Sequence, residues 1–339
     1  MNTKKTLLLV VGIIAVVAAA LLWPRKPAEN PASQPLELRL AADEKAVVSL
    51  LAIVAEKKQL WAQENLKVVF QRFASGRDAA QSLLAKNSDV VTASEFVFML
   101  ASHQHEDLRL FATIAESEKH MQVIGDRKAG VSSVADLKGK KVGATVGSAG
   151  QYLLATVAQS AGLSIGKDDI AHFSPPELEA AMARRGLAAV STWQPHLARI
   201  QAGLGEDAVV LSANGGYRMT FNLVAFSSSL REQREAFLRL LRAFKRAEDS
   251  VKANRAEAVG LLAETTGMER DVVEKILQDY QFEVGLNEHV IATLEKQDEW
   301  AVASKLAESK LPPGEWRKRV ETSLLKEVVP AAVRLNSPQ

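Results

Sequence analysis

Cysteine is absent from the 339-residue chain. Its absence excludes disulfide frameworks, thiolate zinc sites, iron–sulfur clusters, cysteine nucleophiles and a lipid-bearing amino-terminal cysteine. An excess of charge of one sign is also lacking, because 42 lysines and arginines stand against 40 aspartates and glutamates. The basic residues are scattered among the acids, so the chain offers no basic cluster for nucleic acid. We therefore expect no thiol chemistry and no nucleic-acid partner.

Catalytic and metal-binding signatures are scarce as well. The six histidines form no H-E-x-x-H motif, and His103 and His105 would diverge on a helix. The glycine-rich stretch 143–150 lacks the Lys-Ser/Thr of a nucleotide P-loop and the G-x-S-x-G spacing of a nucleophile elbow. We expect no metal, no cofactor and no enzymatic activity.

A long apolar run occurs once, at the amino terminus. Residues 6–23 are uncharged and follow Lys4 and Lys5. As a helix this run is roughly 27 Å long, just enough for a bilayer core. It is either an uncleaved signal anchor, which its ending in Leu-Leu-Trp favours, or a signal peptide cleaved near Ala20. Both interpretations place the rest of the chain outside the cytoplasm.

A proline-rich tether follows at 24–35, with a composition that favours a stiff, solvated linker. Residues 1–35 carry four basic residues and one acid, so the remaining chain has 38 basic and 39 acidic residues. The mild basicity of the protein therefore belongs to the export segment and the tether. The folded body is expected to begin near Leu36.

Strand and helix patterns alternate through this body. Strands are predicted at 36–40, 66–73, 89–92, 108–114, 141–144, 188–191 and 221–226, and helices at 46–61, 75–86, 95–102, 131–137, 148–161, 177–185 and 227–254. This alternation is typical of an α/β layered fold with a largely parallel sheet. We predict two α/β lobes followed by a helical tail.

Two predicted helices begin with residues that suit an anion. Ser75-Gly76-Arg77 precedes one, and Ser148-Ala149-Gly150 precedes the other. A helix amino terminus offers free N–H groups and positive potential, and Arg77 adds a guanidinium that can hold a carboxylate or sulfonate bidentately. An ordinary N-cap with a solvated Arg77, and a tight turn that needs glycine, remain the simpler alternatives.

Trp193 and three acids are further candidates. Trp193 follows a predicted strand, and it is either a core aromatic or a cleft wall over a ligand. Asp43, Glu44 and Glu95 lie near strand ends, where α/β sheets bind ligands. These acids either meet an amine on a ligand or are solvated loop residues.

At these residues the chain resembles the extracytoplasmic substrate-binding proteins of ABC importers, specifically the nitrate/sulfonate/taurine group and its thiamine-pyrimidine-related relatives. The resemblance covers roughly 36–251. It is carried by LRLAADEKAVVSLLAIVAEKKQLW at 38–61, SGRDAAQSLLAKNSDVVTA at 75–93, VADLKGKKVGATVGSAGQYLLATVAQSAGL at 134–163 and VSTWQPHL at 190–197.

This resemblance implies a two-lobed type II periplasmic binding protein fold. Lobe one would comprise 36–121 and 220–339 with the helical tail, and lobe two 122–219. The ligand-binding residues that we expect are Ser75, Gly76, Arg77, Thr92, Ser94, Glu95, Ser148, Ala149, Gly150, Trp193 and Asn222. Asn87, Ser94-Glu95 and Gln194 depart from the usual residues of the group, so the resemblance does not identify the ligand.

The resemblance also implies a function. We expect a monomeric solute-binding receptor that binds a small anionic or zwitterionic molecule, such as a sulfonate, taurine or nitrate, and delivers it to an ABC permease and its ATPase. It would lie on the periplasmic side, anchored to the cytoplasmic membrane by residues 6–23, or secreted as a soluble form if cleaved. A pyrimidine-synthesis-related enzyme on the same scaffold and a membrane-tethered sensor are the alternatives; export and the lack of a His or Cys cluster argue against the enzyme.

Overall fold

The computed structural model describes residues 34–212 and 217–335. The contacts within the chain divide it into two units, Met1–Pro35 and Leu36–Gln339. The predicted apolar helix at 6–23 and nearly all of the predicted tether lie outside the described residues. Among the described helices, none combines the length and the apolar character needed to cross a bilayer.

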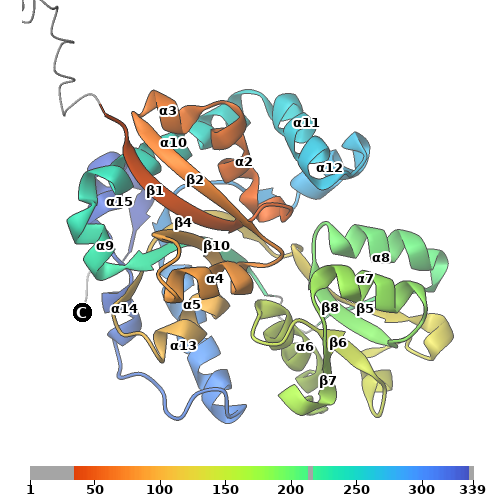
Figure 1. Cartoon of the computed structure of the whole chain (residues 1–339). Helices are drawn as coiled ribbons and strands as arrows, with labels where there is room; N and C mark the ends of the chain where they lie inside the picture. The colour runs from red at the N-terminus through yellow and green to blue at the C-terminus, as the bar shows by residue number, and fades with distance from the viewer. Residues whose placement is uncertain (1–33, 213–216, 336–339) are drawn as a thin grey trace, which may run out of the picture. The chain divides into compact units, whose positions relative to one another are not determined.

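A mixed sheet forms the centre of one of the two parts of the body (Figure 1). In the described residues its strands, in spatial order, are β11 (Tyr280–Gln281), β4 (Leu108–Ser117), β10 (Met219–Phe226), β3 (Val90–Ser94), β1 (Leu36–Asp43) and β2 (Leu66–Phe73). β1 pairs in parallel with β2 and β3, whereas β10 runs antiparallel to β3 and β4. The sheet is less parallel than predicted. The chain returns from the second sheet directly into β10, without the βα crossover that would make β10 parallel to its neighbours.

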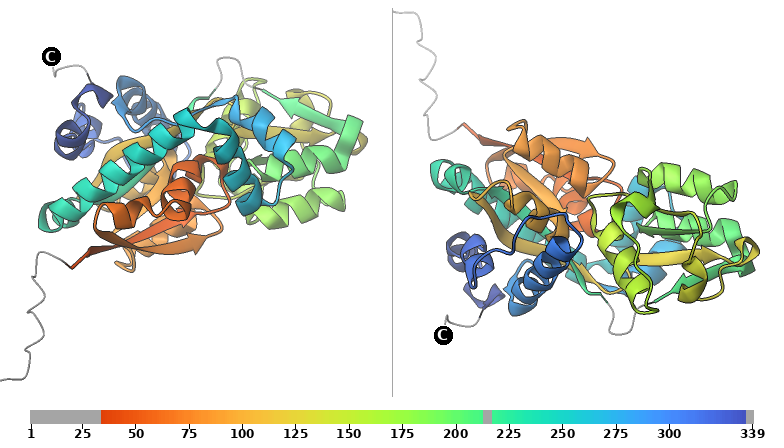
Figure 2. Two further views of the ribbon diagram at one scale, coloured as in Figure 1. Left: turned by 90° about the horizontal axis from the view of Figure 1, so that it is seen from above. Right: turned by 90° about the horizontal axis from the view of Figure 1, so that it is seen from below.

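Helices surround this sheet. They are η2 (Val47–Ser49), α2 (Leu50–Lys57), α3 (Leu60–Gln63), α4 (Gly76–Leu84), α5 (Glu95–Ser102), α9 (Ser227–Glu232), α10 (Arg234–Ala253), α11 (Arg255–Thr266), α12 (Arg270–Leu277), α13 (Glu288–Ala303), α14 (Glu315–Arg319) and α15 (Ser323–Val328). Some of them pack against the sheet, and others, such as α11 and α12, pack against neighbouring helices. Figure 2 shows the long α10 beside α2. The single helix predicted over 46–61 is divided, because Gln59 takes the left-handed φ of 54° between α2 and α3.

A second sheet forms between β4 and β10 in the sequence. Its described strands, in spatial order, are β7 (Ile170–His172), β6 (Val142–Ala144), β8 (Ala189–Trp193), β5 (Met121–Asp126) and β9 (Ala208–Leu211). Its α-helices are α6 (Ala149–Gln159), α7 (Pro175–Ala183) and α8 (His196–Leu204). The chain thus enters this sheet after β4 and leaves it before β10. We call the first sheet with its helices lobe one, and the second lobe two.

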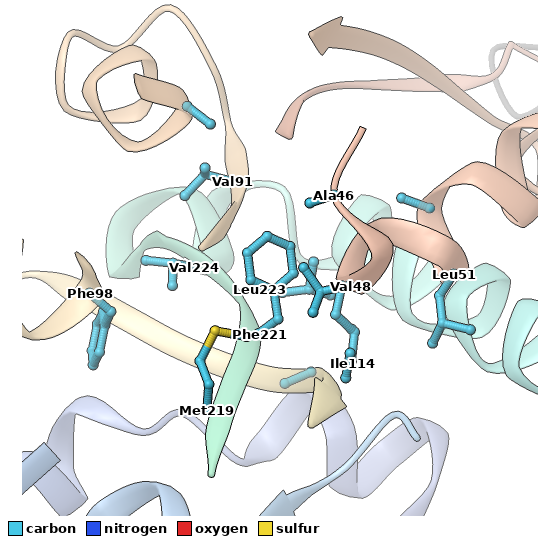
Figure 3. Packing of buried hydrophobic residues seen from close by; sticks show 14 of the residues in the cluster. Ala46, Val48, Leu51, Val91, Phe98, Ile114, Met219, Phe221, Leu223 and Val224 are labelled. Atoms are coloured by element: carbon cyan, nitrogen blue, oxygen red, sulfur yellow. The ribbon is translucent and has the colours of Figure 1, made fainter. Parts of the chain in front are cut away.

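The hydrophobic core of lobe one lies around its sheet. Figure 3 shows Val48, Phe221 and Leu223 converging beside Ile114, and all four are buried. Burying one such side chain contributes about 1.5–3 kcal/mol to stability. Lobe two has an additional cluster around Leu178, whose side chain is fully buried. For the exact limits of the lobes, we propose the boundaries predicted from the sequence, which are 36–121 with 220–339 for lobe one and 122–219 for lobe two.

Candidate functional site

A small cavity lies between the two lobes, with a volume of about 30 Å³. Lobe one and the end of β10 contribute Asp43, Ala46, Val48, Gly76, Arg77, Ser94, Val97, Met219 and Phe221, and lobe two with the crossing before it contributes His120, Met121, Ser148, Ala149 and Trp193. The cavity lies at the carboxyl ends of β1, β3 and β8, where α/β sheets bind ligands. This position makes it the candidate functional site.

Helix amino termini converge on this cavity. Gly76 begins α4, while Ser94 and Ser148 are the N-caps of α5 and α6. The Ser148 hydroxyl accepts a hydrogen bond from the N–H of Gly150 at 3.1 Å, and that of Ser94 accepts one from Val97 at 3.4 Å. These caps satisfy part of the free N–H groups, but the helix dipoles still give the cavity a positive potential. The described helices α4, α5 and α6 therefore favour a negatively charged group.

Gly76 places the start of α4 next to β3. A Cβ atom at this position would lie 3.4 Å from both the Cα of Ala93 and the carbonyl oxygen of Thr92, which is an ordinary van der Waals contact. Ser75, the N-cap of α4, is fully buried, and its hydroxyl exchanges hydrogen bonds with the N–H and the carboxylate of Asp78. Ser75 thus supports the helix start but does not line the cavity.

Arg77 reaches from lobe one to lobe two. A Cβ atom added to Gly147 would lie 2.9 Å from the Nε of Arg77, so the guanidinium group packs against the backbone just before α6. Gly147 also has a φ of +80°, which favours glycine. The ion pair of Arg77 with Asp78 is long, at 3.3 Å, and both side chains are partly exposed. The guanidinium therefore adds positive charge where the α4 and α6 amino termini meet.

Asp43, at the end of β1, is a buried acid in the cavity wall, with 4% of its surface exposed. The Nε1 of Trp193 donates a hydrogen bond of 3.3 Å to its Oδ2, which links the two lobes. Burial raises the pKa of Asp43 to about 7, although the hydrogen bonds from Trp193 and the backbone of Ala46 and Lys45 oppose this rise. The carboxyl group thus titrates near neutral pH.

The other two candidate acids are engaged elsewhere. Glu44 forms an ion pair of 2.7 Å with Arg72. Glu95 is fully buried and accepts hydrogen bonds from the N–H and hydroxyl of Thr220, from Gln297 and from Tyr217. Burial raises the pKa of Glu95. Neither acid lines the cavity.

His120 is buried beside the crossing between the lobes. Its Nδ1 lies 2.8 Å from the hydroxyl of Tyr280, and burial lowers the pKa of the imidazole to about 3. The ring is therefore neutral at physiological pH. Among the described residues that line the cavity, Arg77 is the permanent cation and Asp43 the acid.

The cavity brings together part of the predicted site. Of the predicted residues, those that line it are Gly76, Arg77, Ser94, Ser148, Ala149 and Trp193. Those buried behind or beside it are Ser75, Thr92, Glu95, Gly150 and Asn222. Asn222, for example, accepts a hydrogen bond from Thr113 at 2.8 Å and donates one to Thr220. A role for either group in ligand binding stays a prediction.

Sequence reasoning missed several lining residues. His120 and Met121 stand at the start of a strand, β5, that was not predicted. Val48, Met219 and Phe221 are apolar and look like ordinary core residues in the sequence. Only the folding of the chain brings them to the lining of the cavity. Within the described ranges, no group of three or more His, Asp or Glu side chains is placed to hold a metal ion.

Residues 48–258 match the family model described as NMT1/THI5 like. A protein of Escherichia coli K12 named for the binding of aliphatic sulfonates is 24% identical over 271 residues, which cover 78% of this chain and 83% of that protein. A binding protein of Brucella abortus strain 2308 is 26% identical over 217 residues, covering 63% of this chain. The match spans 66% of the Brucella protein, just under two thirds of its length.

Solved structures show the same fold. The alkanesulfonate-binding protein SsuA of Xanthomonas axonopodis pv. citri, bound to MOPS, has a TM-score of 0.68 at 24% identity, covering 89% of this chain and 99% of that one. The periplasmic aliphatic sulphonate-binding protein SsuA of E. coli has a TM-score of 0.68 at 21% identity, with 84% and 97% covered. The desulfurization enzyme DSZB has a TM-score of 0.61 at 13% identity, with 87% and 99% covered. These likenesses confirm the predicted two-lobed periplasmic binding protein fold.

Proposed function

The chain belongs to the NMT1/THI5-like family, and we propose that it is the solute-binding receptor of an ABC-type importer. Its ligand is a small anionic or zwitterionic molecule of the sulfonate type, held between the lobes. Relatives named for the binding of sulfonates support this class of ligand. A permease and its ATPase are the partners that this function requires.

One observation carries the proposal: the described amino termini of α4, α5 and α6, together with Arg77, meet at one cavity between the lobes. A sulfonate group has three oxygens that accept hydrogen bonds, so it matches several N–H donors and a guanidinium. The neutral His120 adds no charge of its own to the cavity. The geometry therefore suits a strongly acidic group that stays ionised at every physiological pH.

Ligand entry requires the lobes to separate. A cavity of about 30 Å³ has room for roughly one water molecule, much less than an alkyl sulfonate needs. Opening would break the Trp193–Asp43 hydrogen bond and withdraw Arg77 from Gly147. The two chain crossings between the sheets are the natural hinges for this movement.

Location and attachment complete the proposal. The relatives solved as periplasmic proteins support a position outside the cytoplasm. We propose that residues 6–23 export the body and hold it, as a monomer, at the cytoplasmic membrane. If this segment is cleaved near Ala20, the body is released as a soluble protein.

The test is ligand binding by the full-length protein, purified in mild detergent, measured by calorimetry with alkanesulfonates. Arg77→Met should weaken sulfonate binding by about 10- to 150-fold, because a hydrogen bond to a charged group is worth about 1.5–3 kcal/mol. The matched control is Arg231→Met, which removes the same charge from an exposed position on α9. Equal losses in both variants, or full affinity in Arg77→Met, would show that the anion site lies elsewhere.

An enzyme on the same scaffold is a second candidate, favoured by the likeness to DSZB. The described cavity lining has few groups that could act as a nucleophile or a base for an enzyme. The Ser148 hydroxyl donates a hydrogen bond of 2.6 Å to the carbonyl of Thr145 and caps α6, so it serves the backbone. His120 is too weak a base, and the chain has no cysteine. Product formation from a sulfinate or sulfonate by purified protein would reverse this ranking.

A further inference from the structure

Asp43 differs from the neighbouring acids in having no cationic partner. Asp78 lies against Arg77, and Glu44 is paired with Arg72. Among the described residues, no lysine or arginine forms an ion pair with Asp43. The neutral Nε1 of Trp193 is its side-chain hydrogen-bond partner, at a long 3.3 Å. A buried carboxylate whose partners are all neutral, here Trp193 and the backbone N–H groups of Ala46 and Lys45, is costly. A ligand that brings a positive charge to Asp43 would therefore stabilise this carboxylate.

The charges of the cavity are arranged as a pair of opposite sign. Arg77 and the amino terminus of α6 make one part of the lining positive, and Asp43 makes the part next to Trp193 negative. In the structure Arg77 packs against Gly147 and pairs with Asp78 rather than with Asp43. The cavity thus offers one place for an anion and another for a cation.

We propose that Asp43 binds an ammonium group of the ligand, so that the ligand is zwitterionic, with its sulfonate at Arg77 and the α6 amino terminus. This inference rests on the proposed receptor function and narrows its ligand class. Trp193 positions Asp43 by its hydrogen bond when the lobes close over the ligand. Asp43 is then the specificity residue that separates an aminoalkylsulfonate from a plain alkylsulfonate.

The titration of Asp43 gives this pairing a pH dependence. Asp78 raises the pKa of Asp43, and burial does so more strongly, which together with the opposing hydrogen bonds leaves it at about 7. The other groups that face it are the cationic Arg77, the neutral His120, and Lys45 next to it in the chain. An ammonium group binds the ionised carboxylate, so its affinity should fall about tenfold between pH 8 and pH 6.

The experiment compares 2-aminoethanesulfonate with ethanesulfonate, two probes of nearly equal size, by calorimetry on the full-length protein in detergent. The wild type should bind 2-aminoethanesulfonate at least about tenfold more tightly, because a charge-assisted hydrogen bond is added. Asp43→Asn should abolish this preference by losing affinity for 2-aminoethanesulfonate. Circular dichroism and thermal unfolding establish that the variant is folded. The matched control is Glu44→Gln, which removes the adjacent acid and should keep the preference.

Each outcome has a distinct meaning. A wild type that binds both probes equally, or an Asp43→Asn variant that keeps the preference, overturns the role of Asp43 and leaves the receptor function standing. A wild type that binds neither probe overturns the sulfonate-type ligand and, with it, the inference. A preference that is lost in Asp43→Asn, and that declines from pH 8 to pH 6 only for the aminated probe, supports it.

Discussion

Aromatic rings outside the cavity lining join the two lobes. Tyr152 on α6 of lobe two packs against Phe96 of α5 and Trp300 of α13 in lobe one, with ring centroids 5.6 and 5.3 Å apart. Its ring also lies 5.3 Å from that of Tyr217, near the second crossing. Opening of the lobes would separate Tyr152 from Phe96 and Trp300. These rings should therefore stabilise the closed, ligand-binding arrangement.

Tyr152→Ala should weaken ligand binding although Tyr152 does not line the cavity. Each aromatic pair is worth about 0.5–1.5 kcal/mol, so the two pairs that opening would break stabilise closure by about 1–3 kcal/mol. If binding requires closure, the apparent affinity falls with the population of the closed state, and about 1.4 kcal/mol corresponds to tenfold. We therefore expect sulfonate affinity to fall by about 5- to 150-fold.

Two measurements test this expectation on the full-length protein. Calorimetry gives the affinity, and tryptophan fluorescence reports the exposure of Trp300, which should shift to longer wavelength when Tyr152 is removed. Tyr152→Phe is the control, since it keeps the ring and should keep the affinity. Unchanged affinity in Tyr152→Ala, with the variant still folded by circular dichroism, would refute a role of these rings in closure.

Two further predictions concern the cavity. Gly147→Val should weaken sulfonate binding by at least about tenfold, because a side chain there would strain the backbone at φ +80° and displace Arg77; Gly139→Val, at φ +70° with no neighbouring atoms within 4 Å, is the calorimetric control and should bind normally. Asp43 should make the protein less stable as pH rises from 4 to 7, since its pKa is raised from 3.8 to about 7 on folding and the protonated form is the one that folding favours. The free energy of unfolding falls by about 4 kcal/mol at most over this range, and the fall ends above pH 7. Urea unfolding should show that the free energy of unfolding of Asp43→Asn depends less on pH than that of the wild type. Parallel dependences on pH would contradict the assignment.

Local sequence signals account for the elements with strong patterns. The helix predicted at 95–102 and the strand predicted at 66–73 have the same limits in the structure. Ser94 caps the helix, and the strand lies between turn residues, so both are specified by neighbours in the sequence. The short strands β5, β7 and β9 were missed, because their pairing partners lie far away in the chain and their own patterns are weak.

The same distinction applies to the candidate site. The helix starts at Ser75 and Ser148 were predicted from N-cap residues and glycines alone. The packing of Arg77 on Gly147 could not be predicted, because the two residues lie in different lobes and meet only when the lobes close. A sequence pattern specifies where a helix begins, but it does not specify what the helix start faces.

Asp43 shows why the chemistry of the site depends on tertiary structure. The predicted strand ended at residue 40, which left Asp43 and Glu44 as equivalent loop acids. Pairing with β2 extends β1 to Asp43, opposite Phe73, and Trp193 of lobe two then covers it. Glu44, one residue further along, turns to Arg72 instead. Two adjacent acids thus acquire different properties, and the one that loses water without gaining a cation is the one able to discriminate between ligands by their charge.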